Sequence, residues 1–304
     1  MILSVSRRTD IPAFYGEWFF NRLRAGAVLV RNPMNPHQIS RIPLTPEALD
    51  CMVFWTKNPA PMLSRLDELD GFGVPYLFQF TLTPYGRTLE PGLPPKEQVL
   101  ETFQALSRRL GPERVLWRCD PIVLNQEWDI PRHIQAFRML CQALRGYTSR
   151  CTISFVDAYG KLRSAYRQGL LREISPGEMK ELGRELAAVG AEAGIPLQTC
   201  CEAADLTGFG IARGSCIDRK ALERLCGYPI TAKPDNAQRP GCGCLQSVDI
   251  GAYDTCRHGC IYCYACGREP QAHDPASPLL AGTLAPEDRV TDRRIPPVSR
   301  QLSR

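Results

Sequence analysis

Short apolar runs rich in β-branched and aromatic residues alternate along the chain with segments whose apolar residues recur at helical spacing. The helical spacing is clear at Val99, Phe103, Leu106 and Leu110. Seven apolar runs are predicted strands, at residues 2–6, 51–56, 75–83, 114–119, 151–156, 195–200 and 247–253. Because strand and helix alternate repeatedly, the pattern predicts an α/β fold with a parallel sheet.

The ends of the predicted helices carry capping residues. In the stretch 175–194, Ser175 is a candidate N-cap, Pro176 the first helical residue, Glu178 the capping-box partner and Gly194 the stop. Residues 26–44 do not fit a helix, and their Asn-Pro turns predict a hairpin inserted between the first two strand-helix units. We expect one domain over residues 1–266 and an irregular Pro- and Arg-rich tail over 267–304.

Polar side chains follow the carboxyl ends of the predicted strands. They are Arg7, Arg8, Thr9 and Asp10 after the first strand, with Ser6 as its last residue, Lys57 and Asn58 after the second, and Arg118 and Asp120 around the end of the fourth. In parallel α/β folds this edge of the sheet is where chemistry is done. Ion pairs that only stabilise the fold would use the same residue types, so the pattern indicates a site without deciding its role.

Charge and composition limit the possible partners. The chain of 304 residues has a formal net charge of +5, which suits an anionic partner without demanding one. Its basic residues are spread rather than striped, so nucleic acid is possible but not favoured. No run of eighteen uncharged apolar residues is present, and the apolar start before the first arginines is too short for a signal peptide. We therefore expect a cytoplasmic protein without a membrane partner.

Fourteen cysteines are distributed unevenly, and ten of them lie in the last third of the chain. Without a secretory signal they are predicted to be thiols and metal ligands rather than a disulfide framework. The scattered Cys51, Cys119, Cys141 and Cys151 lie in apolar segments, where cysteine behaves as a small core residue. Cys226 lies on the apolar face of a helical segment and is also expected in the core. The cysteine-rich region 200–266 carries the candidate chemistry.

Cys256, Cys260 and Cys263 are spaced C-x3-C-x2-C, with Tyr262 directly before the last cysteine. Three thiolates can ligate three irons of a [4Fe-4S] cluster, and the absent fourth ligand leaves one iron open to a small molecule. This spacing resembles the signature of the radical S-adenosylmethionine (SAM) superfamily. The resemblance implies a [4Fe-4S] cluster whose open iron binds SAM, and reductive cleavage of SAM to a 5'-deoxyadenosyl radical that acts on an unknown substrate.

The flanking residues extend the resemblance. The stretch "CRHGCIYCYA" is similar to the cluster loop of spore photoproduct lyase-like proteins. The segments "SRRTDIPAFY", "VRNP", "FWTKNP", "WRCDPI" and "SVDIGAYDTCRHGCIYCYA" resemble one uncharacterised family, domain of unknown function 1848. The resemblance covers nearly all of residues 1–266. It implies a class of chemistry and no substrate.

The superfamily usually carries its cysteine loop after the first strand, whereas here the loop follows the last. The resemblance therefore implies a parallel, partial TIM-type (β/α) barrel, circularly permuted so that the cluster-bearing strand is last and lies beside the first strand. It places Ser6, Arg7, Thr9, Asp10, Asn58 and Tyr262 as candidate SAM contacts and Lys57, Arg118 and Asp120 as candidate catalytic or orienting residues. The usual Gly-Gly-Glu motif is missing. An electron donor such as flavodoxin or ferredoxin is the implied partner.

Two other interpretations of the cysteines stay open. Cys260, Cys263 and Cys266 also fit the C-x2-C-x2-C of bacterial ferredoxins, whose fully ligated cluster only carries electrons. A zinc-stabilised binding module could instead pair Cys242 and Cys244 with later cysteines. The remaining late cysteines could hold a second, auxiliary [4Fe-4S] cluster, or they could be unpaired thiols or a zinc site. The auxiliary-cluster ligands would be Cys201 (or Cys200), Cys216, Cys242 and Cys244.

Overall fold

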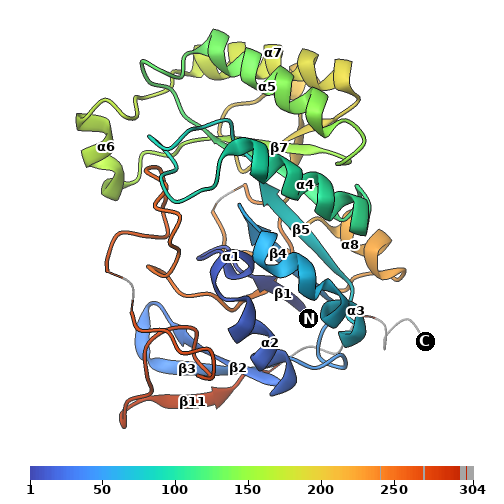
Figure 1. Ribbon diagram of the computed structural model, residues 1–304, viewed down its shortest axis with the longest axis vertical. Helices are drawn as coiled ribbons and strands as arrows, with labels where there is room; N and C mark the ends of the chain where they lie inside the picture. The colour runs from blue at the N-terminus through green and yellow to red at the C-terminus, as the bar shows by residue number, and fades with distance from the viewer. Residues whose placement is uncertain (240, 270, 295–298, 300–304) are drawn as a thin grey trace.

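The computed structural model describes residues 1–239, 241–269, 271–294 and 299, and its centre is an eight-stranded sheet (Figure 1). The strand order is β10-β1-β4-β5-β6-β7-β8-β9, and every neighbouring pair is parallel. The strands are β1 (Ile2–Val5), β4 (Cys51–Thr56), β5 (Tyr76–Thr81), β6 (Val115–Ile122), β7 (Cys151–Phe155), β8 (Leu197–Cys200), β9 (Ala212–Gly214) and β10 (Val248–Asp249). The predicted parallel α/β sheet is confirmed.

The last strand of this sheet lies beside the first. Leu3 pairs with Val248 and Ser4 with Asp249, so β10 adds to the free edge of β1 although some 240 residues separate them. The expected adjacency of the two strands is therefore confirmed, although β10 is only two residues long. β9 and β10 are the two ends of the sheet, and no pairing within the described residues joins them into a closed barrel.

Helices cover both faces of the sheet. They are α1 (Ile11–Phe14), α2 (Gly16–Arg24), α3 (Leu66–Phe72), α4 (Lys96–Leu110), α5 (Ile130–Leu144), α6 (Arg163–Arg167), α7 (Pro176–Ala193) and α8 (Arg219–Cys226). Short 3-10 turns add Ala60–Arg65, Gly160–Leu162 and Thr207–Phe209. In Figure 1, α5 and α7 lie side by side at the top, and α8 lies apart from them. No helix in the described part of the chain is long and apolar enough to cross a membrane.

Helix α7 confirms the capping signals of its sequence. Ser175 accepts a hydrogen bond from the Glu178 backbone nitrogen, and the Glu178 carboxylate accepts one from the Ser175 nitrogen, which closes the capping box. Pro176 occupies the first turn, where its missing N–H costs nothing. Gly194 ends the helix at φ 71°, a left-handed conformation that glycine adopts without strain.

A second, three-stranded sheet lies below the main one in Figure 1. Its strands β2 (Ala27–Asn32) and β3 (Asn35–Pro43) form the predicted antiparallel hairpin. Its third strand, β11 (Arg289–Asp292), comes from the tail that was expected to be irregular, and pairs parallel with β3. The four residues of β11 are all exposed, so its sequence has no alternation of apolar and polar residues that would predict a strand. It is a strand because it pairs with the free edge of β3. Residues 270, 295–298 and 300–304 of the predicted tail lie outside the described residues.

The core has a part on each face of the main sheet. Leu3, Met52, Phe54 and Phe78 belong to the larger cluster, where the rings of Phe54 and Phe78 stack at 4.8 Å. The alternate residues of the same strands, among them Ile2, Cys51, Val53 and Leu77, pack in a second cluster beneath α8. The predicted burial of Cys51, Cys119, Cys141 and Cys151 is confirmed, and Cys226 packs half-buried against the second cluster.

Candidate functional site

A cavity of about 480 Å³ opens at the carboxyl ends of the parallel strands. Most of the polar residues predicted for this edge line it: Ser6, Arg7, Thr9, Asp10, Lys57, Arg118 and Asp120. Asn58 is not among the lining residues; its side-chain oxygen accepts from the Ala60 backbone and shapes the turn after β4. The structure therefore gathers the ends of β1, β4, β6, β7 and β8 around one space.

The cysteine loop, residues 255–266, forms one wall of this cavity. Cys256, Cys260 and Cys263 line the cavity, whereas Cys266 is not one of the lining residues. The loop is fixed to the segment between β5 and α4, because Ile261 donates its backbone N–H to Leu89 and Gly92 donates to the carbonyl of His258. The three cysteines of the C-x3-C-x2-C motif thus share a rigid wall.

The fourth cysteine of the loop, Cys266, contacts two of the other three. Its Sγ donates to the Cys256 carbonyl at 3.5 Å, and its thiol beside that of Cys263 raises the pKa of the Cys263 thiol. Burial raises the pKa of Cys260 to about 12, although the nearby Lys57 ammonium acts in the opposite direction. As arranged here, no group of three or more Cys, His, Asp or Glu side chains in the described residues could hold a metal ion.

A buried carboxylate, Glu90, holds the wall behind the loop. It is 1% exposed and accepts from Lys57 Nζ at 2.7 Å, from Thr83 Oγ1 at 2.7 Å, and from Lys96 and the Tyr262 hydroxyl. Burial alone would raise the pKa of Glu90, but the two lysines outweigh it and lower the pKa to about 2. The carboxylate therefore stays charged and fixes both Lys57 and the Tyr262 ring at the cavity.

Two aspartates connect the end of β1 to the cysteine loop. Asp10 caps α1 through the Ala13 backbone N–H, and its other oxygen lies 2.8 Å from His258 Nε2 and accepts from the Lys57 backbone. Asp249 accepts from the side chains of Ser4 and Ser6 and from the backbone of Arg7 and Gly251. The carboxylate oxygens of Asp249 lie 2.9 Å from Ser4 Oγ, 2.5 Å from Ser6 Oγ, 2.8 Å from the Arg7 nitrogen and 3.0 Å from the Gly251 nitrogen. Asp249 thus ties the strand that precedes the cysteine loop to the strand that begins the chain.

The floor of the cavity combines an indole with two guanidinium groups. Arg7 and Arg118 lie 5.0 and 5.3 Å from the Trp55 ring centre, within the range of cation–π attraction. The Arg118 guanidinium also pairs with Asp120, which accepts in turn from Ser154. Within the described residues, Arg7 Nη2 and Thr9 Oγ1 are buried without a hydrogen-bond partner. Such polar atoms at a cavity wall favour a polar or anionic ligand.

A second group of thiols lines the same cavity. Cys216 Sγ is 2.9 Å from Cys200 Sγ, hydrogen-bonds Cys244, and accepts from Arg118 Nη1 at 2.6 Å. These contacts, those with the two cysteines first, lower the pKa of Cys216 well below its usual value despite burial. Cys201 lines the same cavity, but its thiol lies 4.0 Å from the Arg239 carbonyl and is acted on by Cys242. Of the two candidates, Cys200 rather than Cys201 therefore joins Cys216 and Cys244.

The mouth of the cavity is polar and aromatic. Arg239 pairs with Asp157, and the Tyr159 and Tyr264 rings approach at 6.0 Å. Beside the mouth, Glu202 accepts from the Phe155 backbone at 2.9 Å, and burial raises the pKa of Glu202 to about 7. Charged side chains thus surround the entrance while thiols, arginines and Trp55 line the interior.

The family described as Domain of unknown function (DUF1848) matches residues 2–265. The chain belongs to this family. The match covers β1, β10 and nearly all of the cysteine loop, so the two paired strands both belong to the region that the family shares.

Other comparisons add no function. No curated protein matches the chain. A solved structure titled "endoglucanase" is 8% identical over 83% of this chain and 91% of that one, with a TM-score of 0.27. That TM-score is too low to argue for a shared fold or a shared activity.

Several residues of the site carry no signal in the sequence. Glu90 comes from an irregular Pro-rich segment, Lys96 begins helix α4, and Trp55 lies inside a strand that the apolar pattern assigned to the core. His258, within the cysteine loop, was not predicted to pair with Asp10. Only Asp249, a charge at the end of an apolar run, shares the strand-end pattern that identified the other residues.

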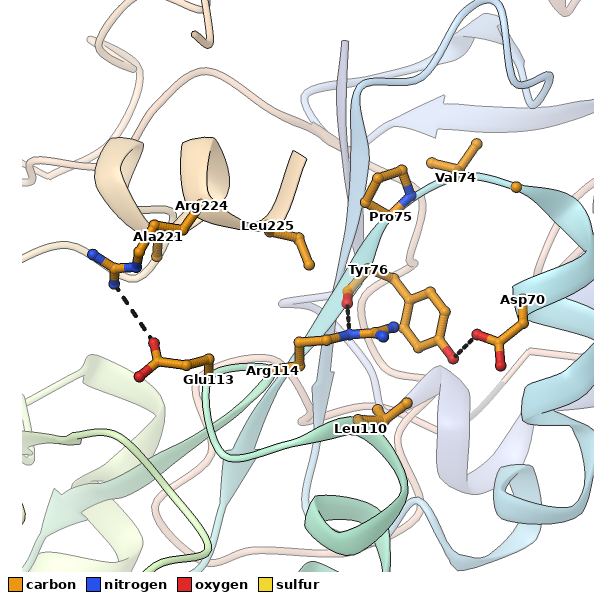
Figure 2. A pocket seen from close by; sticks show the side chains of 11 residues that line it. Asp70, Val74, Pro75, Tyr76, Leu110, Glu113, Arg114, Ala221, Arg224 and Leu225 are labelled. Atoms are coloured by element: carbon orange, nitrogen blue, oxygen red, sulfur yellow. Dashed lines mark hydrogen bonds and ion pairs between the residues drawn. The ribbon is translucent and has the colours of Figure 1, made fainter. Parts of the chain in front are cut away.

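A second hollow, of about 510 Å³, lies at the opposite end of the sheet (Figure 2). It is bounded by the start of β5, the end of α4 and the face of α8. Figure 2 shows its polar side chains engaged with one another: Arg114 donates to the Tyr76 carbonyl, Tyr76 to Asp70, and Arg224 pairs with Glu113. These contacts tie neighbouring elements together at the amino ends of the strands.

Proposed function

We propose that the protein is a radical SAM enzyme whose Cys256, Cys260 and Cys263 hold a [4Fe-4S] cluster. The observation that carries the proposal is the position of these cysteines: all three line one cavity at the carboxyl edge of a parallel sheet. Their strand, β10, lies beside β1, as a circularly permuted partial barrel of this superfamily requires.

The chemistry of the donor set fits an iron-sulfur cluster. Thiol sulfurs are the usual ligands of such clusters, and the three half-buried cysteines line one cavity. Binding a cluster would require their side chains to turn toward a common centre, because as arranged in the described residues they form no metal-binding group. Arg7 and Thr9 line the same cavity, and their Nη2 and Oγ1 atoms are buried without partners in the described chain. Those two atoms are available to bind the carboxylate of SAM or an anionic substrate.

When bound, the cluster would supply the electron for reductive cleavage of SAM. The protein's own residues position the reactants. Trp55 offers an apolar face for stacking, with Arg7 and Arg118 beside it as bidentate donors for a carboxylate or phosphate. Tyr262, fixed through Glu90, forms a rigid wall next to the cysteines. The polar mouth and buried floor would limit access of water and oxygen to the substrate.

A second candidate is a closed, fully ligated cluster that only transfers electrons. The contacts of Cys266 with Cys256 and Cys263 favour this alternative, because they bring a fourth thiol next to two of the three motif cysteines. The exclusion of Cys266 from the cavity lining favours the open site. A purely structural zinc module would contain neither iron nor sulfide.

The test compares single cysteine variants after anaerobic reconstitution, with iron and sulfide counted and 5'-deoxyadenosine release from SAM measured after reduction. Cys263→Ala is expected to lose both the cluster and the release, whereas Cys266→Ala keeps both. Loss of the cluster in Cys266→Ala, with no release by the unmodified protein, would establish the electron carrier instead. The auxiliary cluster on Cys201 (or Cys200), Cys216, Cys242 and Cys244 stays a prediction, for which about eight irons per chain would be required. The electron donor is proposed to be a flavodoxin or ferredoxin.

A further inference from the structure

We propose that Arg7 and Thr9, together with the indole N–H of Trp55, bind a carboxylate or phosphate group of the substrate. That the ligand is a substrate rests on the proposed function, whereas binding of the group itself does not require the cluster. The three residues lie at the carboxyl ends of two neighbouring strands, since Val5 of β1 pairs with Phe54 of β4. All three line the cavity.

The charges of the cavity wall leave one cation without a counter-charge. Five basic side chains line the cavity, and four of them pair with a carboxylate: Arg8 with Asp249, Lys57 with Glu90, Arg118 with Asp120, and Arg239 with Asp157. No carboxylate of the described residues pairs with the fifth, Arg7, which is half-buried. A guanidinium that has lost part of its hydration without gaining an anion is unfavourable. An oxyanion in the cavity would supply the missing charge.

Three donors of the same wall also lack acceptors. Arg7 Nη2, Thr9 Oγ1 and Trp55 Nε1 are buried and have no hydrogen-bond partner in the described part of the chain. Thr9 is only 6% exposed, so bulk water does not satisfy its hydroxyl. Guanidinium and indole N–H groups can only donate, so a ligand that satisfies them must accept. Arg7 and Trp55 stay partly exposed at the cavity, which allows a ligand to reach them.

The backbone and the Trp55 ring hold Arg7 in place before a ligand binds. Asp249 accepts from the Arg7 nitrogen at 2.8 Å, and the Tyr264 hydroxyl donates to the Arg7 carbonyl at 2.6 Å. The Trp55 ring centre lies 5.0 Å from the Arg7 guanidinium and limits its movement. Less conformational freedom is then lost on binding, which raises the affinity for a ligand of matching charge.

The position of the three donors favours the substrate over SAM as the source of the oxyanion. Trp55 packs in the apolar cluster that contains Cys216 and Cys244. Cys260 of the cysteine loop packs in a different cluster, with Tyr262. Under the proposed function, SAM binds at the open iron of that loop. A separate oxyanion site therefore belongs to the second reactant.

The first test titrates inorganic phosphate and acetate, at constant ionic strength, into the cluster-free full-length protein by calorimetry. At least one of them is expected to bind, and Arg7→Gln should weaken that binding at least about tenfold. Arg8→Gln is the matched control, because it removes the same charge from the neighbouring residue, and it should change the affinity less than about twofold. No binding of either anion, or an equal loss in Arg7→Gln and Arg8→Gln, would overturn the proposal.

Thr9→Val separates a binding role from a structural one. The variant should weaken anion binding about fivefold, because one donor is lost. Its urea midpoint without added anion should not fall, because the change removes only a buried hydroxyl that has no partner. A lower midpoint with unchanged anion binding would show that Thr9 only supports the fold and would contradict its place in the site.

The second test identifies the source of the oxyanion by adding SAM to the reconstituted protein with the anion bound. Both are expected to bind together. Displacement of the anion by SAM would overturn the proposal, because the site would then hold the carboxylate of SAM. Loss of anion binding on uptake of about eight irons would also overturn it, because an auxiliary cluster would then be the counter-charge of Arg7. Anion binding by a protein that releases no 5'-deoxyadenosine would support the site and contradict the proposed function alone.

Discussion

Replacing Glu90 by glutamine tests the charge network that holds the cysteine loop. The variant keeps the shape of the side chain but leaves Lys57 and Lys96 without their counter-charge, at side-chain exposures of only 15% and 22%. Lowering the pKa of a buried glutamate from 4.5 to about 2 corresponds to about 3 kcal/mol of stability. Removal of one partner from a buried ion pair typically costs about 3–5 kcal/mol, in agreement. We expect the free energy of unfolding at pH 7 to fall by about 3 kcal/mol.

The stability contributed by Glu90 is expected to depend on pH. Because the pKa of Glu90 is depressed in the folded protein, its contribution is present above about pH 4.5 and is lost as the pH falls towards 2. Urea titrations of both proteins under reducing conditions, from pH 7 down to pH 3, should show the difference narrowing with acid. Glu68→Gln is the matched control, since Glu68 also contacts two basic residues, Arg24 and Arg65, but at the surface. It should cost less than about 1 kcal/mol. A difference for Glu90→Gln that is equally small, or that does not change with pH, would refute the reasoning.

Three further substitutions probe the loop and the frame. Gly92→Ala would place a Cβ 2.6–2.7 Å from carbonyl oxygens of the cysteine loop, so we expect reconstituted iron content to fall at least twofold. Gly86→Ala, which meets nothing within 4 Å, should leave the iron content unchanged. Asp249→Asn replaces an accepting oxygen by an NH2 group, which cannot accept from the four groups that donate to Asp249. The free energy of unfolding in urea titrations should therefore fall by about 1–3 kcal/mol. Ser175→Ala removes the cap of α7 and should cost about 1 kcal/mol, with no change in iron content.

The apolar pattern predicted strands and helix caps well, because burial on both faces and capping chemistry act locally. The strand at residues 51–56 was predicted at its observed bounds, and Ser175 and Gly194 bound α7 as expected. β9 and β11, with three and four mostly exposed residues, have no such pattern; they are strands because a neighbouring edge was free to pair.

The site was predictable where a motif defines it and not where folding brings distant side chains together. The C-x3-C-x2-C spacing identified three thiols that line the cavity. The choice between Cys200 and Cys201 could not be made from sequence, because neighbouring residues near a strand end point in different directions and only the path of residues 214–216 decides between them. Glu90 contacts Tyr262 across 172 residues of chain, a pairing that no local signal carries.

The central claim is that the cysteine loop holds a cluster with one open iron that cleaves SAM. The most direct measurement is 5'-deoxyadenosine release from SAM by the anaerobically reconstituted, reduced full-length protein. The account predicts about four irons at the loop and release that disappears in Cys260→Ser. An intact, reducible cluster that binds no SAM and releases no 5'-deoxyadenosine would contradict it.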